Sequence, residues 1–268
     1  MRTTPLVALA ASVVLTVGVG SAASAVDPGK ADLSVLHGIP GLTVDVYVNG
    51  DLTLDDFAPG DLAGPLSLAP GTYSVAITAS DAVDDSAPVL GPIDISLEAD
   101  MSYTAAAHLD ASGDPTVSLF TNDITAAGSG DGRLTVRHLA AAPAVDILAD
   151  GNAVFTSLAN PDEAKADVPA ATYSAAVALA GTTDPVIGPA DVEVTEGMNT
   201  IVYAWGSAED SNLALAVQTV DLAMGSPDDV QAGLPVSDDG AVPWALIAMA
   251  VAALAVASVA GSRALARR

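Results

Sequence analysis

Two histidines, His37 and His138, are the side chains of this sequence with the clearest potential for chemistry, because an imidazole can act as a general base or bind a metal near neutral pH. Each of them ends a short apolar stretch and precedes a proline-containing turn. Neither lies in a pattern that pairs a histidine with a nucleophilic serine or cysteine. A lone imidazole at a strand end usually donates to a nearby carbonyl, so we expect structural roles and predict no catalytic residue.

Two aspartates, Asp45 and Asp146, follow these histidines on the polar face of the next predicted strand. They could pair with the histidines, with Arg137 in the second case, or with a turn amide, and each of these roles is structural. Carboxylates that lie a whole domain apart do not flank one scissile glycosidic bond, so the sequence gives little support to glycosidase chemistry.

Metal and cofactor sites are not assigned, although acidic residues cluster at four places: 55–56, 84–85, 110–114 and 228–229. None of these clusters has the Asp-x-Asp-x-Asp-Gly spacing of a loop that wraps a calcium ion. Weak, loop-based calcium binding therefore stays an alternative hypothesis. The sequence also has no phosphate-binding loop, dinucleotide fingerprint or zinc-ligand spacing.

The elements that position these residues occur twice. Three pairs recur at a constant offset of 101 residues (138 − 37), namely His37 and His138, Asp45 and Asp146, and Gly50 and Gly151. A period of about 100 residues is too long for a solenoid and indicates a duplicated domain. We place the copies at residues 26–125 and 133–222, joined by a small, Gly-rich linker at 126–132.

Each copy has the pattern of an all-β domain. Residues 44–48 alternate apolar and polar side chains, and Asn49-Gly50 then predicts a two-residue hairpin turn, as Asp150-Gly151 does in the second copy. Tyr73 and Tyr173 recur at the same place and suggest a tyrosine that ties down a sandwich corner. Seven or eight short strands per copy predict two tandem immunoglobulin-like antiparallel β-sandwiches, with a β-barrel as the alternative fold.

The repeated motif resembles a known family. The residues His37 and Val44-Asp45-Val46-Tyr47-Val48-Asn49-Gly50 are similar to the opening of the domain-of-unknown-function 4397 family, and the segment from His138 to Ile147 follows the same order. The segment Pro70-Gly71-Thr72-Tyr73 also resembles the family, whereas the second copy has Ala171 in place of the glycine. The resemblance implies secreted or surface-anchored bacterial β-sandwiches, and it implies no established activity.

The composition limits the partners. The formal net charge is −25, from 33 acidic and 8 basic residues, which argues against nucleic acid or an anionic lipid surface as a partner. There is no cysteine, and only 4% of the residues are aromatic, so burial of Val, Leu and Ile must stabilise the fold. High Ala, Asp and Val with little Lys suits an actinobacterial protein.

The two ends predict export and anchoring. Residues 1–25 have the pattern of a signal peptide with an Ala23-x-Ala25 cleavage site. An acidic tether at 223–240 precedes a predicted transmembrane helix at 241–262 and a basic tail at 263–268. We therefore expect an exported protein held in the cell membrane with its body outside. Sortase linkage to the cell wall, through the loose Leu234-Pro235-Val236-Ser237-Asp238 motif, is the alternative.

These observations favour a non-enzymatic surface module that binds an envelope polymer or a neighbouring surface protein, or that acts as a structural spacer. Two alternatives remain at this stage. One is an extracellular hydrolase with a site in the groove between the two domains. The other is a calcium-dependent adhesin.

Overall fold

The computed structural model describes residues 26–223. The predicted signal peptide with Ala23 and Ala25, the tether from residue 224 onward, the transmembrane helix and the basic tail lie outside these residues. Within residues 26–223, no helix has the length and hydrophobicity needed to cross a membrane.

The described part of the chain is built from strands, eight in each copy. The first copy contains β1 (Ala31–Gly38), β2 (Val44–Val48), β3 (Asp51–Phe57), β4 (Leu62–Leu68), β5 (Gly71–Ala79), β6 (Leu90–Leu97), β7 (Met101–Leu109) and β8 (Pro115–Asn122). The second contains β9 (Asp131–His138), β10 (Val145–Ala149), β11 (Asn152–Leu158), β12 (Glu163–Pro169), β13 (Ala171–Leu179), β14 (Pro185–Val194), β15 (Met198–Trp205) and β16 (Ala214–Asp221).

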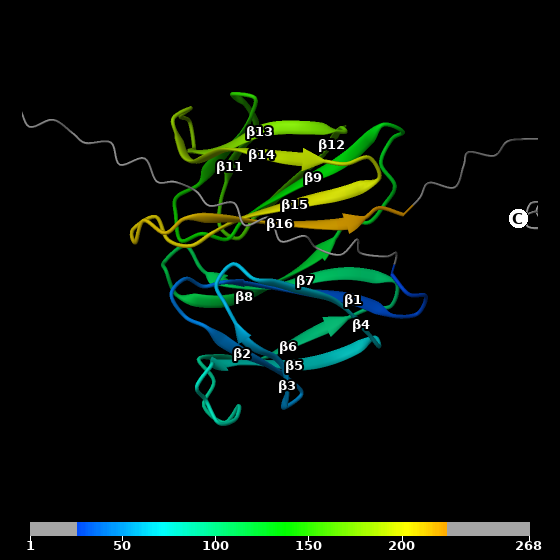
Figure 1. Cartoon of the computed structure of the whole chain (residues 1–268), viewed down its shortest axis with the longest axis vertical. Coiled ribbons are helices and arrows are strands. Elements are labelled where there is room, and N and C mark those ends of the chain that lie inside the picture. The colour runs from blue at the N-terminus through cyan, green and yellow to red at the C-terminus, as the bar shows by residue number, and fades with distance from the viewer. Residues whose placement is uncertain (1–25, 224–268) are drawn as a thin grey trace, which may run out of the picture. The chain divides into compact units, whose positions relative to one another are not determined.

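The strands form four sheets, which pair into two sandwich-like units (Figure 1). The first unit consists of the sheets β4-β1-β7-β8 and β3-β2-β5-β6, and the second of β12-β9-β15-β16 and β11-β10-β13-β14. The strand order is the same in both units: β9 takes the place of β1, β10 that of β2, and so on to β16, which takes the place of β8. The predicted all-β, sandwich architecture is confirmed, and the barrel alternative is wrong.

Two finer details of the predicted fold are corrected. The pairs β1–β7 and β9–β15 run parallel, so the sheets are not fully antiparallel. The strand order also differs from the immunoglobulin order, in which the first two strands are neighbours in one sheet. Here the chain crosses from one sheet to the other between β1 and β2, which leaves β1 free to pair with β4 and β7.

The inner strands β1, β7, β9 and β15 are buried on both faces. One face of each lies in the core of its own sandwich, with Leu33 in the first and Val202 in the second. The other face lies in a third cluster that joins the sandwiches and contains Leu36 of β1 and Tyr203 of β15. In Figure 1 these strands accordingly lie between the two outer sheets. Burial on both faces explains why residues 33–37 alternate only weakly.

The predicted hairpin turns are confirmed in both copies. Asn49 and Gly50 have φ of +53° and +84°, and Asp150 and Gly151 have φ of +50° and +79°. Positive φ at both central residues defines the type I′ turn, whose twist matches that of the strands it joins. The side chain of Asn49 also accepts a hydrogen bond from the Ser74 amide. In the second copy, the side chain of Asp150 accepts one from the Ser174 amide.

The predicted corner tyrosines make the expected contact. The hydroxyl of Tyr73 donates to the carbonyl of Ala69 over 2.8 Å, and that of Tyr173 donates to the carbonyl of Pro169 over 2.7 Å. In each case the acceptor lies four residues upstream, before the strand that carries the tyrosine. The contact therefore fixes the entry into β5 and β13.

Candidate functional site

The two motif histidines close the turn after β1 and β9. Nε2 of His37 donates to the Leu42 carbonyl over 2.7 Å, and Nε2 of His138 donates to the Pro143 carbonyl over 3.1 Å. Both rings are buried, and their Nδ1 atoms have no hydrogen-bond partner. Burial lowers the pKa of both imidazoles, because removal from water disfavours the charged form of the ring.

The third histidine, His108 on β7, is also buried. Its Nδ1 lies 2.8 Å from the Leu109 carbonyl, and its Nε2 lies 2.9 Å from the hydroxyl of Ser118. Burial lowers its pKa. All three imidazoles of the described residues thus bind to the main chain, and one binds a serine hydroxyl inside a sheet.

The motif aspartates stabilise a β-bulge in each copy. Between the pairs Val44–Phe57 and Val46–Leu54, the single residue Asp45 opposes both Asp55 and Asp56. Oδ1 of Asp45 accepts a hydrogen bond of 2.9 Å from the amide of Asp56, which has φ of +51°. Of the partners expected for Asp45, a main-chain amide is the one found.

The second copy has the same bulge with different side chains. Thr156 and Ser157 oppose Asp146 there, and Oδ1 of Asp146 accepts from the Ser157 amide over 2.8 Å. Ser157 has φ of +57°, close to that of Asp56. The other carboxylate oxygen, Oδ2, accepts from the amide of Gly181 over 2.8 Å. The backbone is therefore shared, and both oxygens of Asp146 are satisfied by main-chain donors.

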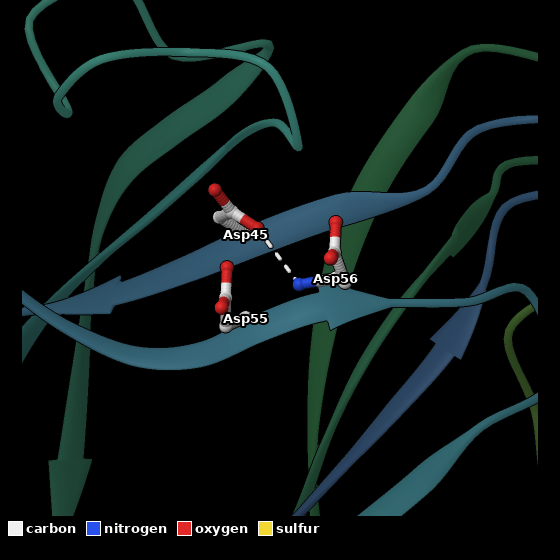
Figure 2. A group of neighbouring side chains, drawn as sticks. All are labelled: Asp45, Asp55 and Asp56. Carbon is white, nitrogen blue, oxygen red and sulfur yellow. Dashed lines mark hydrogen bonds between the residues drawn. The ribbon is translucent and has the colours of Figure 1, made fainter.

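The first copy instead gathers three carboxylates at its bulge. Figure 2 shows Asp45 on β2 beside Asp55 and Asp56 on β3, with the hydrogen bond from the Asp56 amide. One carboxylate oxygen from each side chain lies within 4.8 Å of the others. Asp45 is only 3% exposed, whereas Asp55 and Asp56 are exposed. The acidic pair noted in the sequence is thus placed against a buried third carboxylate.

A buried hydroxyl accompanies these carboxylates. Thr78 on β5 is directly opposite Asp45 on β2, and directly opposed side chains of neighbouring strands share a face of the sheet. Thr78 is 0% exposed, and its Oγ1 has no hydrogen-bond partner. The residue opposite Asp146 is Ala178, which has no hydroxyl. Sequence reasoning missed Thr78, because only strand pairing brings it to Asp45.

Further acidic residues lie near Tyr47, the motif tyrosine of β2. Burial and the carboxylates of Asp45, Asp85, Asp84 and Asp55 raise the pKa of the Tyr47 hydroxyl. Asp84 and Asp85 belong to the connection between β5 and β6, residues 80–89, whereas the second copy has only residues 180–184 there. The first copy therefore carries more negative charge around Tyr47 than the second copy carries at the corresponding place.

The first sandwich also contains an apolar cavity of about 270 Å³ between its sheets, and its counterpart in the second is about 20 Å³. Val35, Val46, Leu54 and Ala105 are among the residues that line it. In the second copy Val202 stands at the position of Ala105. Ala105 pairs with Val35 of β1, and Val202 pairs with Val136, which stands at the same place in β9. The smaller side chain contributes to the larger cavity.

Arg137 of β9 links the two sandwiches. Its guanidinium donates to Glu163 over 2.9 Å and to the Tyr203 hydroxyl over 2.9 Å within the second copy. It also donates to Oδ1 of Asn122 of the first copy over 3.0 Å and lies 4.3 Å above the ring of Phe120. The Arg137 side chain is 1% exposed. The possible pairing of Arg137 with Asp146 is replaced by these interface contacts.

A second buried contact runs through Gln218 of β16. Its Nε2 donates to the Ser34 hydroxyl over 3.0 Å, and its Oε1 accepts from the Thr104 hydroxyl over 3.0 Å. Ser34 and Thr104 belong to β1 and β7 of the first copy, so these bonds also cross the interface. Side chains therefore fill the contact between the sandwiches, and the polar groups of Arg137 and Gln218 are hydrogen bonded across it.

Comparison with protein families identifies the first copy. Residues 31–148 match the family model described as domain of unknown function, DUF4397. Residues 31–148 thus carry a DUF4397 domain. The match begins at β1 and ends within β10, so it covers the first sandwich and continues into the second. No curated protein matches the chain.

The expectation of two DUF4397 copies is supported in part. The second unit, residues 131–221, has the strand order of the first, while the family model covers only its opening strands. Its likeness to the DUF4397 domain rests on this shared topology and on the paired contacts of His138, Asp146, Gly151 and Tyr173.

Proposed function

We propose that this chain is a non-enzymatic binding module of a bacterial cell surface, in which the second sandwich holds the DUF4397 sandwich in a fixed orientation. One observation carries the proposal. Both copies keep the bulge, the hairpin turn and the corner tyrosine, but only the first adds Asp55, Asp56 and Thr78 around the shared aspartate. What the fold needs recurs in both copies, so the chemistry found in one copy is the candidate for recognition.

The surroundings of the titratable groups favour binding over hydrolysis. The three imidazoles are buried and hydrogen bonded, which leaves none of them at a water-accessible position beside a nucleophile. A hydrolase site in the groove between the domains would need an open, concave surface. The buried Arg137 and Gln218 contacts lie in that position instead.

The location and partners are part of the proposal. The predicted signal peptide and transmembrane helix support an exported protein with its body outside the membrane, or, alternatively, linked to the wall by a sortase. The net charge of −25 disfavours nucleic acid and suits a partner with cationic groups or bound cations. An envelope polymer and a neighbouring surface protein are the two kinds of partner that fit this location outside the membrane.

A binding screen tests the proposal. Residues 26–223 would be immobilised and exposed to wall glycans, other envelope polymers and extracted surface proteins, with millimolar calcium and with chelator. We expect saturable binding to one class of partner, weakened by the D55T/D56S double substitution. Release of soluble products from any polymer would overturn the non-enzymatic assignment. Absence of binding in both conditions would reject the binding role in favour of a structural spacer.

A further inference from the structure

We infer that the bulge of the first sandwich is a divalent-cation site, selective for calcium, with Asp45, Asp55, Asp56 and Thr78 as its ligands. This inference names the chemistry of the face described above, and it rests on the proposed function only for its biological purpose. Its ligand atoms are all oxygens, from carboxylates and a hydroxyl, which suits hard cations such as calcium and excludes a preference for softer metals.

The geometry of the carboxylates fits one shared ion. Calcium binds oxygens at about 2.3–2.6 Å, so two ligands of one ion lie at most about 5 Å apart. The oxygens of Asp45, Asp55 and Asp56 lie within 4.8 Å of one another (Figure 2). The bulge produces this approach, because it sets two consecutive residues of β3 against one residue of β2.

No basic side chain of the described residues neutralises this cluster. The four ion pairs within residues 26–223 all involve Arg133, Arg137 or Lys165 of the second copy. Three carboxylates of like charge at this separation repel one another. A bound dication would remove most of this charge.

Thr78 is the independent observation that points to a ligand. Its hydroxyl is completely buried and has no hydrogen-bond partner, and it lies opposite Asp45 on the same face of the sheet. Buried hydroxyls without a partner are uncommon, since desolvation of the group is then uncompensated. A cation between Thr78 and the three carboxylates would accept the free lone pairs of this oxygen.

The second copy shows how the same bulge is completed without a cation. There Oδ2 of Asp146 accepts the Gly181 amide, Ala178 replaces Thr78, and Thr156 and Ser157 replace the two aspartates. In the first copy, Oδ1 of the Asp45 carboxylate accepts a hydrogen bond, whereas its Oδ2 accepts none from the described residues. The free oxygen, the added charge and the buried hydroxyl therefore occur together, and they occur in one copy.

The affinity expected for this site is modest. Asp55 and Asp56 are exposed, so water completes the coordination shell. Extracellular calcium modules of this kind have dissociation constants of about 10⁻⁴–10⁻³ M. Magnesium, which demands a near-octahedral shell at shorter distances, is expected to bind more weakly.

The test uses residues 26–223 and the metal ion alone, so that its outcome is independent of any polymer. Calcium chloride is titrated by calorimetry, and thermal unfolding is followed with and without 10 mM calcium. We expect saturable heat with one site and a rise in Tm. The D55T/D56S variant installs the residues that the second copy has at the same bulge, and it should lose both responses. Thr78→Ala should weaken the affinity several-fold.

A charge-matched control separates a site from general screening. The D94N/E98Q variant also removes two negative charges, from exposed positions on and after β6, and should keep the full calcium response. Equal stabilisation of D55T/D56S and the unsubstituted protein by calcium would overturn the inference, as would the absence of heat at 10 mM calcium. Failure of the polymer screen with calcium binding intact would reject the proposed function and leave the cation site standing.

Discussion

At the scale of single residues, burial decides what the motif side chains do. His37 and His138 differ from catalytic histidines in having one ring nitrogen bonded to a carbonyl and the other without a partner. This arrangement holds the imidazole neutral. The same burial gives the histidines a measurable effect on stability.

Acidification from pH 7.5 to pH 5 is expected to destabilise residues 26–223. Burial lowers the pKa of His37, His108 and His138 in the folded state below the ordinary value of 6.5, so the unfolded chain takes up protons first as the pH falls. The contribution of the three neutral imidazoles to the free energy of unfolding is thus complete above about pH 6.5, the pKa of the unfolded chain, and it is lost as the pH falls through their lower pKa values in the folded state. Urea unfolding at several pH values measures the slope, which H138Q should reduce. A free energy of unfolding that does not change over this range would contradict the prediction.

The cavity of the first sandwich predicts a stabilising substitution. Ala105→Val adds two carbons where the second copy has Val202, and it should raise the free energy of unfolding by about 1 kcal/mol through buried apolar area. The reverse change, Val202→Ala, should cost about 2 kcal/mol, because its surroundings are already filled. Urea unfolding of both variants checks the pair. Destabilisation by Ala105→Val would show that the space is not free for a side chain.

At the scale of elements, the bulge between β2 and β3, repeated between β10 and β11, is the feature on which the site depends. It places a residue with positive φ opposite a buried aspartate, and the aspartate binds the amide exposed there. Because this contact is present in both copies, we assign it to the fold. The side chains added at the bulge of the first copy are then free to serve another purpose.

Removal of the bulge acceptor in the second copy tests this assignment away from the cation site. Asp146→Ala leaves the amides of Ser157 and Gly181 without their acceptor and should cost about 2–3 kcal/mol. Asp191→Asn removes the same charge from an exposed position on β14 and should change stability by less than about 0.5 kcal/mol. Chemical denaturation compares the two. Equal effects would mean that charge, and not the bulge contact, explains the loss.

At the scale of the whole described unit, the two sandwiches share a buried contact. Leu36, Tyr203 and Trp205 supply its apolar part, while Arg137 and Gln218 supply polar bonds across it. A separated first sandwich would expose this face to water. We therefore expect residues 26–223 to unfold in a single cooperative transition.

Loss of the Arg137 guanidinium should weaken this coupling. Arg137→Leu leaves Tyr203 and Asn122 with fewer partners in a buried interface and should cost about 3 kcal/mol. Lys165→Ala, which removes the same charge from a side chain that is 46% exposed, should cost about 1 kcal/mol or less. Calorimetry should show one transition for the unsubstituted protein and a broadened or split one for Arg137→Leu. An unchanged, single transition in that variant would argue against coupling through this residue.

The sequence by itself determined the features that depend on near neighbours. The alternation at residues 44–48 and the turns at 49–50 and 150–151 follow from local backbone preferences, and the duplication is visible in the spacing of His37 and His138. The tyrosine contact also spans only four residues. The turns and the tyrosine contact were predictable because their interacting groups lie close together along the chain, and the duplication was predictable because the same motif recurs at a constant spacing.

Only the tertiary structure decided which strands pair and which faces meet. The parallel pairing of β1 with β7 joins residues about 70 apart, and the Arg137 contact with Asn122 depends on the packing of two domains. The acidic pair at 55–56 was visible in the sequence, but a bulge and a third strand bring it to Asp45 and Thr78. Apolar burial drives such long-range contacts without specifying them residue by residue, so composition and spacing alone could not reveal this site.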